Sequence, residues 1–316
     1  GCARRKIMPD RTNPSISRAA LLRIAPLTTF PALPSFASTS HKAGVLLRDG
    51  SLLPLASFGV QIYDDRTAEA LTLQALKAGF TSFFTSADAG NQRGFARALA
   101  QSGVQRSNLF VAASVLSDDV ESFTGARSRT ARACVESLRN LERGGLSGVD
   151  MLMLERPART RAGIAGQWSA LRGMRDAGAC QSLGVCNFGL DELDALVEES
   201  PLVNQLPFSL GVRMPHAAVL KAHARRGVQL QAWGPLGGPD NYFPKSLLAE
   251  CAAIGRPSGW SGQQVALRWI LQSGVAFCVH SGNPRHLRDD IAVLDFELSE
   301  EAMHTLSALA TKPWSA

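Results

Sequence analysis

The chain has 316 residues, 45% hydrophobic and 19% charged, and a mean hydropathy of zero, which is typical of a folded protein and excludes disordered and collagen-like chains. No stretch approaches the roughly 18 to 20 apolar residues that cross a bilayer, which excludes a transmembrane span and leaves peripheral membrane attachment open. The net charge of +6 is carried by residues 1–42, so residues 43–316 are formally neutral and offer no basic face for nucleic acid.

Residues 1–42 differ in composition from the rest of the chain. They are rich in Ser, Thr, Pro and Arg, and Asp10 is their one acidic residue. This composition predicts either an organellar transit peptide, for a plastid or a mitochondrion, or an unstructured extension of a cytoplasmic protein. The opening Gly1-Cys2, followed by basic residues, also resembles an acylation signal. We expect this extension to tether the chain to protein partners in a multisubunit complex.

From residue 43 onward, short apolar runs alternate with amphipathic segments. The turn dipeptide Asp49-Gly50 predicts a β-hairpin over 44–54. Apolar runs then predict strands over 55–60, 81–84, 109–113, 149–154, 182–186, 202–205, 228–233 and 276–279. Segments with helical spacing predict helices over 68–78, 94–102, 129–143, 166–177, 190–198 and 263–272.

This alternation predicts an α/β fold class. Strands that alternate with helices pair in parallel, and eight such units in residues 43–316 favour a single (β/α)8 TIM barrel whose base is closed by the hairpin. The alternative is a doubly wound open sheet. That fold usually carries a G-x-G-x-x-G motif after its first strand, and this chain has none there.

The six cysteines and six histidines are dispersed along the chain. There is no C-x-x-C pair and no His at ligand spacing, so we expect neither a metal site nor a disulfide framework, and we interpret the cysteines as reduced thiols of the core. Nucleophile-elbow, zinc-protease and P-loop motifs do not occur either.

Several motifs occur in an order that is typical of one enzyme family. They include Ala75-Leu76-Lys77-Ala78-Gly79-Phe80, Gly184-Val185-Cys186-Asn187-Phe188, Val203-Asn204-Gln205 and Gln231-Ala232-Trp233-Gly234-Pro235. On these motifs, residues 44–309 resemble the aldo-keto reductases. The resemblance implies a (β/α)8 barrel that reduces carbonyl compounds with NADPH at the carboxyl ends of its strands.

The resemblance also locates four catalytic positions, which hold Asp, Tyr, Lys and His in the family. The Tyr is the general acid, and the Lys, held by the Asp, lowers its pKa. In this chain the four positions are occupied by Phe84, Ala89, Ser114 and Glu155. The first three cannot donate a proton near neutral pH, and we expect Glu155 to form an ion pair with Arg156. The resemblance therefore implies that the family's usual proton transfer is absent.

The positions that hold the nicotinamide in the family are partly kept. Asn187 and Gln205 match the residues that bind its carboxamide, and Cys186 replaces a serine. Trp233 stands where an aromatic ring stacks on the nicotinamide, although a plain core aromatic is the alternative interpretation.

At the phosphate end Ser281 is kept, but His280 and His286 stand in place of permanent cations. Asp290 replaces a neutral amide and repels a 2′-phosphate unless Arg285 or Arg288 compensates. We therefore expect weak NADP(H) binding or none.

Three classes of function are compatible with these residues. The main hypothesis is a catalytically inactive aldo-keto-reductase-like protein, a pseudoenzyme that serves as a scaffold or accessory subunit of a larger organellar assembly. The alternative is an NADP(H)-dependent oxidoreductase of small carbonyls with a rearranged site, in which Glu155, Cys186 or His216 performs the acid–base chemistry. A binding module that senses a nucleotide is a further alternative.

Overall fold

The computed structural model describes residues 44–60, 62–196, 198–237 and 243–310, which belong to one compact unit, Leu33–Ala316. The predicted extension over 1–42 lies outside the described residues, so its targeting, acylation and tethering functions stay predictions. Among the helices of the described ranges, none combines the length and the hydropathy that a membrane span requires.

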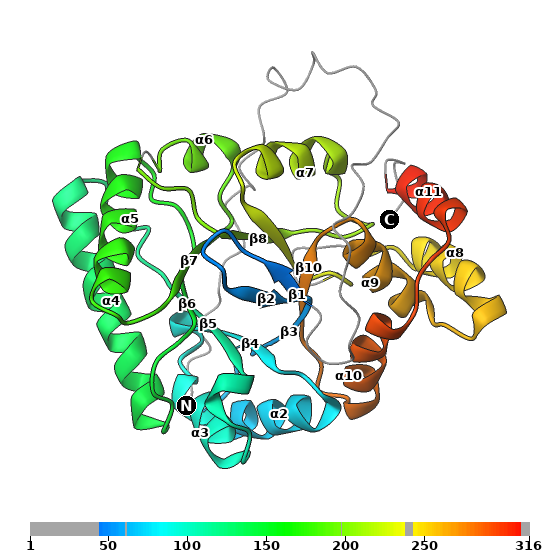
Figure 1. Cartoon of the computed structure of the whole chain (residues 1–316), viewed down its shortest axis with the longest axis horizontal. Helices are drawn as coiled ribbons and strands as arrows, with labels where there is room; N and C mark the ends of the chain where they lie inside the picture. The colour runs from blue at the N-terminus through cyan, green and yellow to red at the C-terminus, as the bar shows by residue number, and fades with distance from the viewer. Residues whose placement is uncertain (1–43, 61, 197, 238–242, 311–316) are drawn as a thin grey trace, which may run out of the picture. The chain divides into compact units, whose positions relative to one another are not determined.

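The centre of the molecule is a closed barrel of parallel strands, in the order β10-β3-β4-β5-β6-β7-β8-β9 (Figure 1). The strands are β3 (Ala56–Gly59), β4 (Ser82–Ser86), β5 (Phe110–Val115), β6 (Met151–Leu154), β7 (Ser182–Cys186), β8 (Val203–Pro207), β9 (Gln229–Trp233) and β10 (Ala276–Val279). The pairing of β10 with both β3 and β9 closes the ring. The predicted TIM barrel is confirmed, and the open-sheet alternative is wrong because the barrel has no strand edge.

Helices form a ring outside the strands (Figure 1). They are α2 (Asp65–Ala78), α3 (Gln92–Gln101), α4 (Phe123–Arg143), α5 (Arg161–Asp176), α6 (Leu190–Leu193), α7 (His216–Arg225), α8 (Lys245–Gly255), α9 (Gly262–Gln272), α10 (Pro284–Ile291) and α11 (Glu300–Leu309). Single 3₁₀ turns lie at η1 (Ala87–Ala89), η2 (Arg106–Asn108), η3 (Arg256–Ser258) and η4 (Ala292–Asp295).

Local signals set several helix ends. The Asp64 carboxylate accepts the backbone N–H of Thr67 at the start of α2, and Gly79 ends that helix with φ +105°. The helix predicted over 190–198 is shorter than expected, because after Leu193 the backbone closes tighter bonds from Ala195 to Glu192 and from Leu196 to Leu193. This turn buries the Leu196 side chain.

The predicted hairpin, β1 (Gly44–Leu46) with β2 (Leu52–Pro54), closes the amino-terminal end of the barrel. Leu47 and Leu53 pack against Met151 and Ala276, which lie at the beginnings of barrel strands. The Ser182 hydroxyl at the start of β7 donates to Asp49 Oδ2 at 2.5 Å. Because this end is filled, ligands have access to the barrel only at the opposite, carboxyl-terminal end.

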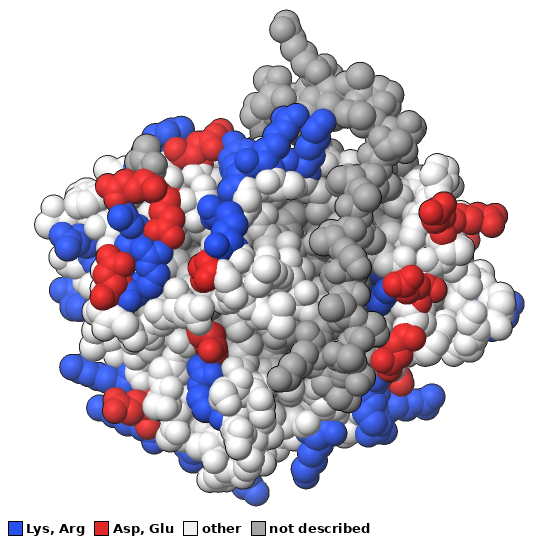
Figure 2. Space-filling model, viewed as in Figure 1, with Lys and Arg blue, Asp and Glu red and all other residues white. Residues whose placement is uncertain are grey.

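The described cysteines are free and buried: Cys134, Cys180, Cys186, Cys251 and Cys278. Burial raises the pKa of Cys134 and of Cys278 to about 12, so both remain neutral thiols. The interpretation of these five as core thiols is confirmed. On the surface, acidic and basic side chains are interspersed around the rim of the face shown in Figure 2, in keeping with the formal neutrality of residues 43–316.

Candidate functional site

Polar side chains gather where the barrel strands end, at the carboxyl-terminal mouth. Ser86 ends β4 and pairs in register with Ser114 near the end of β5. Glu155 directly follows β6, and Asn187 directly follows β7. The parallel register places these residues at one level of the barrel.

Glu155 is the centre of this group. Its Oε2 accepts a hydrogen bond from Ser86 Oγ at 3.0 Å and a second one from Ser114 Oγ. Among the described residues, Glu155 Oε1 has no hydrogen-bond partner. Two donated hydroxyls hold one carboxylate oxygen in place and leave the other free to accept a hydrogen bond.

The ion pair expected between Glu155 and Arg156 is wrong. Consecutive side chains at a strand end point in opposite directions, and the Arg156 side chain is exposed, whereas Glu155 is half-buried and turned toward the two serines. Ser86 is a site residue that the sequence analysis missed. Its only signal was a hydroxyl at the last position of a strand.

The other two positions that the resemblance assigns to the tetrad hold apolar side chains. Phe84 lies on β4 between Gly59 of β3 and Ala112 of β5 and is half-buried. Ala89 lies in η1 and is buried. Neither can exchange a proton, so proton transfer at this mouth depends on other residues.

Asn187 has a left-handed backbone with φ +61°, which is uncommon for a residue other than glycine. Its amide is fixed from both sides: Nδ2 donates to the Glu155 main-chain oxygen at 3.0 Å, and Oδ1 accepts from Trp233 Nε1 at 3.0 Å. Trp233 is half-buried and is not among the buried core residues. The Asn187 amide thus joins the Trp233 indole to the Glu155 main chain, and the binding of a nicotinamide at these groups stays a prediction.

Gln205 belongs to a polar ladder inside the barrel. Its Nε2 donates to Gln231 Oε1 at 2.8 Å, Gln231 Nε2 donates to Ser57 Oγ at 3.1 Å, and Ser57 shares a 2.7 Å hydrogen bond with Ser82. All four residues are buried. The ladder fixes the orientation of the Gln205 amide before any ligand binds.

Cys186 and His216 do not have the surroundings of acid–base catalysts. Burial, aided by the charge of Glu155, raises the pKa of Cys186 well above its usual range, and the thiol lies 3.9 Å from Gln205 Oε1. His216 is buried against the rings of Phe208 and Trp269, and burial lowers its pKa. Of the three candidates in the sequence analysis, Glu155 is the one that is placed for proton transfer.

At the phosphate end, both ring nitrogens of His280 already have hydrogen-bond partners within the protein. Its Nδ1 lies 3.0 Å from the Gly59 carbonyl oxygen, and its Nε2 lies 3.0 Å from the hydroxyl of Tyr63, whose ring stacks on the imidazole. Burial lowers the pKa of His280, so the ring is neutral and the Tyr63 hydroxyl donates to Nε2. Tyr63 had no role in the sequence analysis, because its partner is 217 positions away.

The remaining phosphate-end residues provide little positive charge. Ser281 Oγ accepts the backbone N–H of Asn283 at 3.1 Å. Asp290 is buried, and burial, together with the charge of Asp289, raises its pKa to about 7. Arg285 is exposed, with Nε 3.9 Å from Asp289 Oδ2.

These groups fit the nicotinamide end of the dinucleotide better than its 2′-phosphate end. The amides of Asn187 and Gln205 each donate one N–H within the described protein and keep a second for a carboxamide. The neutral His280 and the buried Asp290 supply no cation for a 2′-phosphate.

Comparison with known proteins gives consistent matches. The family model described as "Aldo/keto reductase family" matches residues 55–311. An aldo-keto reductase from Mycolicibacterium smegmatis is 32% identical over 268 residues, 84% of this chain and 90% of that protein. One from Mycolicibacterium vanbaalenii is 33% identical over 271 residues, 84% and 91% of the two chains.

Solved structures share the fold. The crystal structure of an aldo/keto reductase from Brucella melitensis has a TM-score of 0.76 and 24% identity, and covers 86% of this chain and 100% of its own. An aldo-keto reductase from a Medee basin deep-sea metagenome library has a TM-score of 0.75 and 22% identity. The match covers 86% of this chain and 97% of that one. At these identities the likeness concerns the fold alone.

These matches correct the main functional hypothesis. An inactive scaffold or accessory subunit was inferred from the replaced tetrad positions, but the relatives that align over almost their whole length are named as reductases. The inference failed because it treated the loss of particular side chains as the loss of the reaction. The same mouth still holds an ionisable carboxylate, hydroxyl donors and an amide cradle.

Proposed function

Because the chain belongs to the aldo/keto reductase family, we propose that it is an NADP(H)-dependent oxidoreductase of small carbonyl compounds with a rearranged proton-transfer site. In this proposal the Asp, Tyr and Lys of the usual tetrad are absent, and Glu155 takes over the proton transfer. The observation that carries it is the Glu155 carboxylate, held by Ser86 and Ser114 at the mouth of the barrel with one oxygen free.

NADP(H), when bound, supplies or accepts a hydride at the substrate carbon. Asn187 and Gln205 would hold its carboxamide, and Trp233 offers a flat face for stacking. The protein's own part is at the substrate oxygen. Glu155 Oε1 accepts the hydroxyl proton when an alcohol is oxidised, and the protonated carboxyl returns it when a carbonyl is reduced.

Ser86 and Ser114 have a positioning function in this proposal. Their hydroxyls hold Glu155 Oε2, so Oε1, which has no partner among the described residues, stays available to a substrate oxygen.

The first experiment is a titration of the full chain with NADPH, and in parallel with NADH, followed by quenching of tryptophan fluorescence. Saturable but weak quenching by NADPH supports the cradle. Absence of quenching by either dinucleotide contradicts it. Since the cation positions are not kept, we expect the two affinities to be similar.

The second experiment measures NADPH oxidation with a panel of small aldehydes and ketones. Glu155→Gln keeps the shape of the side chain but cannot exchange the proton, so kcat is expected to fall by roughly 10² or more. The matched control is Glu301→Gln on α11, whose side chain is exposed. Equal activity of the wild type and Glu155→Gln contradicts the proposed function of Glu155.

A nucleotide-sensing module is the second candidate, favoured by the apolar side chains of Phe84 and Ala89 at two former proton-transfer positions. It predicts that NADPH binds with no turnover of any substrate. The two experiments together therefore distinguish the candidates.

A further inference from the structure

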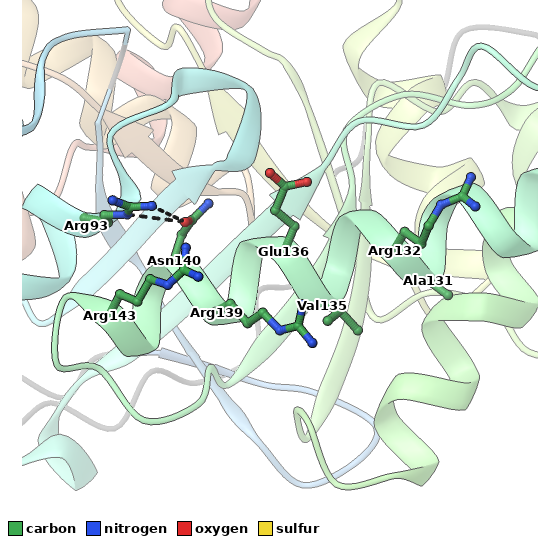
Figure 3. Close-up of a pocket in the computed structure, with 8 residues that line it drawn as sticks. All are labelled: Arg93, Ala131, Arg132, Val135, Glu136, Arg139, Asn140 and Arg143. Carbon is green, nitrogen blue, oxygen red and sulfur yellow. Dashed lines mark hydrogen bonds between the residues drawn. The ribbon is translucent and has the colours of Figure 1, made fainter.

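Away from the mouth, an open groove of about 760 Å³ runs along α4 beside α3. Figure 3 shows its basic residues, with Arg93 on α3 and the others on α4. Arg132, Arg139 and Arg143 are exposed and form no ion pair within the described residues, and Arg93 only donates to the Asn140 amide oxygen at 3.4 Å. We name the surface formed by Arg93, Arg132, Arg139 and Arg143 the basic groove. Glu136 is the one carboxylate among the described residues that line this groove, so four positive charges face a single negative one.

A second, acidic cleft of about 340 Å³ adjoins the basic groove and shares Glu136 and Asn140 with it. It is lined by the carboxylates of Asp88, Asp118, Asp119 and Glu136. Of these, Asp119 forms a 3.5 Å ion pair with Arg129, and the other three form none within the described part of the chain. Because Glu136 and Asn140 line both pockets, the two charged surfaces adjoin along α4, where Figure 3 shows the Glu136 carboxylate pointing away from the Arg139 guanidinium group.

Both surfaces also have a small apolar floor. Ala131 and Val135 line the basic groove, and Ala87, Leu116 and Ala133 line the acidic cleft. Contact at these floors removes some apolar surface from water and brings the opposite charges of two molecules close together.

We propose that a second copy of this chain docks here, with the basic groove of each copy on the acidic cleft of the other. In a dimer with a two-fold axis the contact between groove and cleft forms twice, once from each copy, and this self-complementary geometry is that of the commonest homodimers. A small anion or a nucleic acid is a poorer occupant, because the adjoining carboxylates repel it. The second copy carries on one surface both the cations and the carboxylates that the pattern requires.

The charge pattern also sets the expected behaviour of the dimer. Ion pairs between exposed side chains are individually weak and are screened beyond about 8 Å at physiological ionic strength. We therefore expect reversible association that weakens steeply as salt is added. This inference does not depend on the proposed activity.

The test is sedimentation equilibrium of the full chain at about 0.05 M and about 0.5 M salt, chosen to span strong and weak screening. The wild type is expected to dimerise at low salt and to dissociate at high salt. A monomer at low salt over the whole accessible concentration range overturns the proposal, including the case in which the groove serves an acidic partner protein instead.

Two charge variants sharpen the test. The first, Arg139→Glu with Arg143→Glu, makes both surfaces acidic, and the second, Asp88→Arg with Asp118→Arg, makes both basic. Each is expected to be monomeric alone, whereas an equimolar mixture is expected to form a heterodimer. Failure of the mixture to associate, or self-association of either variant like that of the wild type, contradicts the inference.

A matched control keeps the charge change and moves it elsewhere. Lys221→Glu with Arg225→Glu reverses two exposed cations one turn apart on α7 and is expected to dimerise as the wild type does. Circular dichroism and thermal unfolding of every variant verify the fold. Monomeric control protein would mean that net charge, not the groove, governs the association.

Discussion

Replacing Asp290 by asparagine should make the stability of the protein less dependent on pH. Asp290 is on α10, is 6% exposed, and has its pKa raised from 3.8 to about 7, mainly by burial and further by the charge of Asp289. Between these two values the folded state keeps a proton that the unfolded state has lost. The stabilisation that the proton provides is complete below about pH 4 and is lost as the pH rises to about 7.

The size of the effect follows from the shift. About three pH units at about 1.4 kcal/mol each give about 4 kcal/mol as an upper bound. Relative to wild type, the Asp290→Asn variant should thus gain up to about 4 kcal/mol in unfolding free energy between pH 4 and pH 8. The change with pH is the informative quantity, because the new amide adds a constant difference of its own.

The assay is urea unfolding of both proteins at about pH 4, 6 and 8, monitored by circular dichroism. Asp289→Asn is the control: it removes the neighbouring charge, lowers the pKa of Asp290 and should give a smaller effect in the same direction. A difference between wild type and Asp290→Asn that is the same at every pH would refute the reasoning.

Three further predictions concern the ladder, the phosphate end and the helices. Gln231→Leu removes the acceptor of Gln205 Nε2 and one of the two partners of Ser57, so urea unfolding should show a loss of about 2–4 kcal/mol. His280→Lys supplies a cation at the phosphate end, so fluorescence titration should show NADPH affinity rising roughly tenfold, with NADH affinity unchanged; equal gains for both would contradict the assignment. Gly94→Ala places a Cβ 1.9 Å from the Asp65 carbonyl oxygen and should destabilise the protein by about 1–3 kcal/mol or more. The same change at Gly173, where no atom lies within 4 Å, should instead stabilise α5 by up to about 1 kcal/mol, and equal signs at the two sites would contradict the packing argument.

The parts of the fold that depend on local signals could be predicted from the sequence. The Asp49-Gly50 turn indicated the hairpin, and apolar runs located β7 and β10 to the residue. The helix predicted to continue to residue 198 ended early, because its last apolar side chains are buried by a tighter turn, which periodicity alone does not reveal.

The site was harder to predict, because its hydrogen bonds join distant parts of the chain. Glu155 could be identified from the resemblance, but its partners depend on the register that places Ser86 beside Ser114. The pairing of Tyr63 with His280 depends on β10 closing against β3. The first follows from the register of neighbouring strands and the second from barrel closure, and a linear pattern contains neither.

The ladder of Gln205, Gln231, Ser57 and Ser82 consists of amides and hydroxyls, none of which titrates in the range where proteins stay folded. The orientation of the Gln205 amide is therefore independent of acidity. Its neighbour Cys186 does not titrate in that range either, since burial raises its pKa well above the usual value of a thiol. The amides and hydroxyls of the barrel interior therefore act as a fixed template for whatever binds at the mouth, whether the solution is acidic or basic.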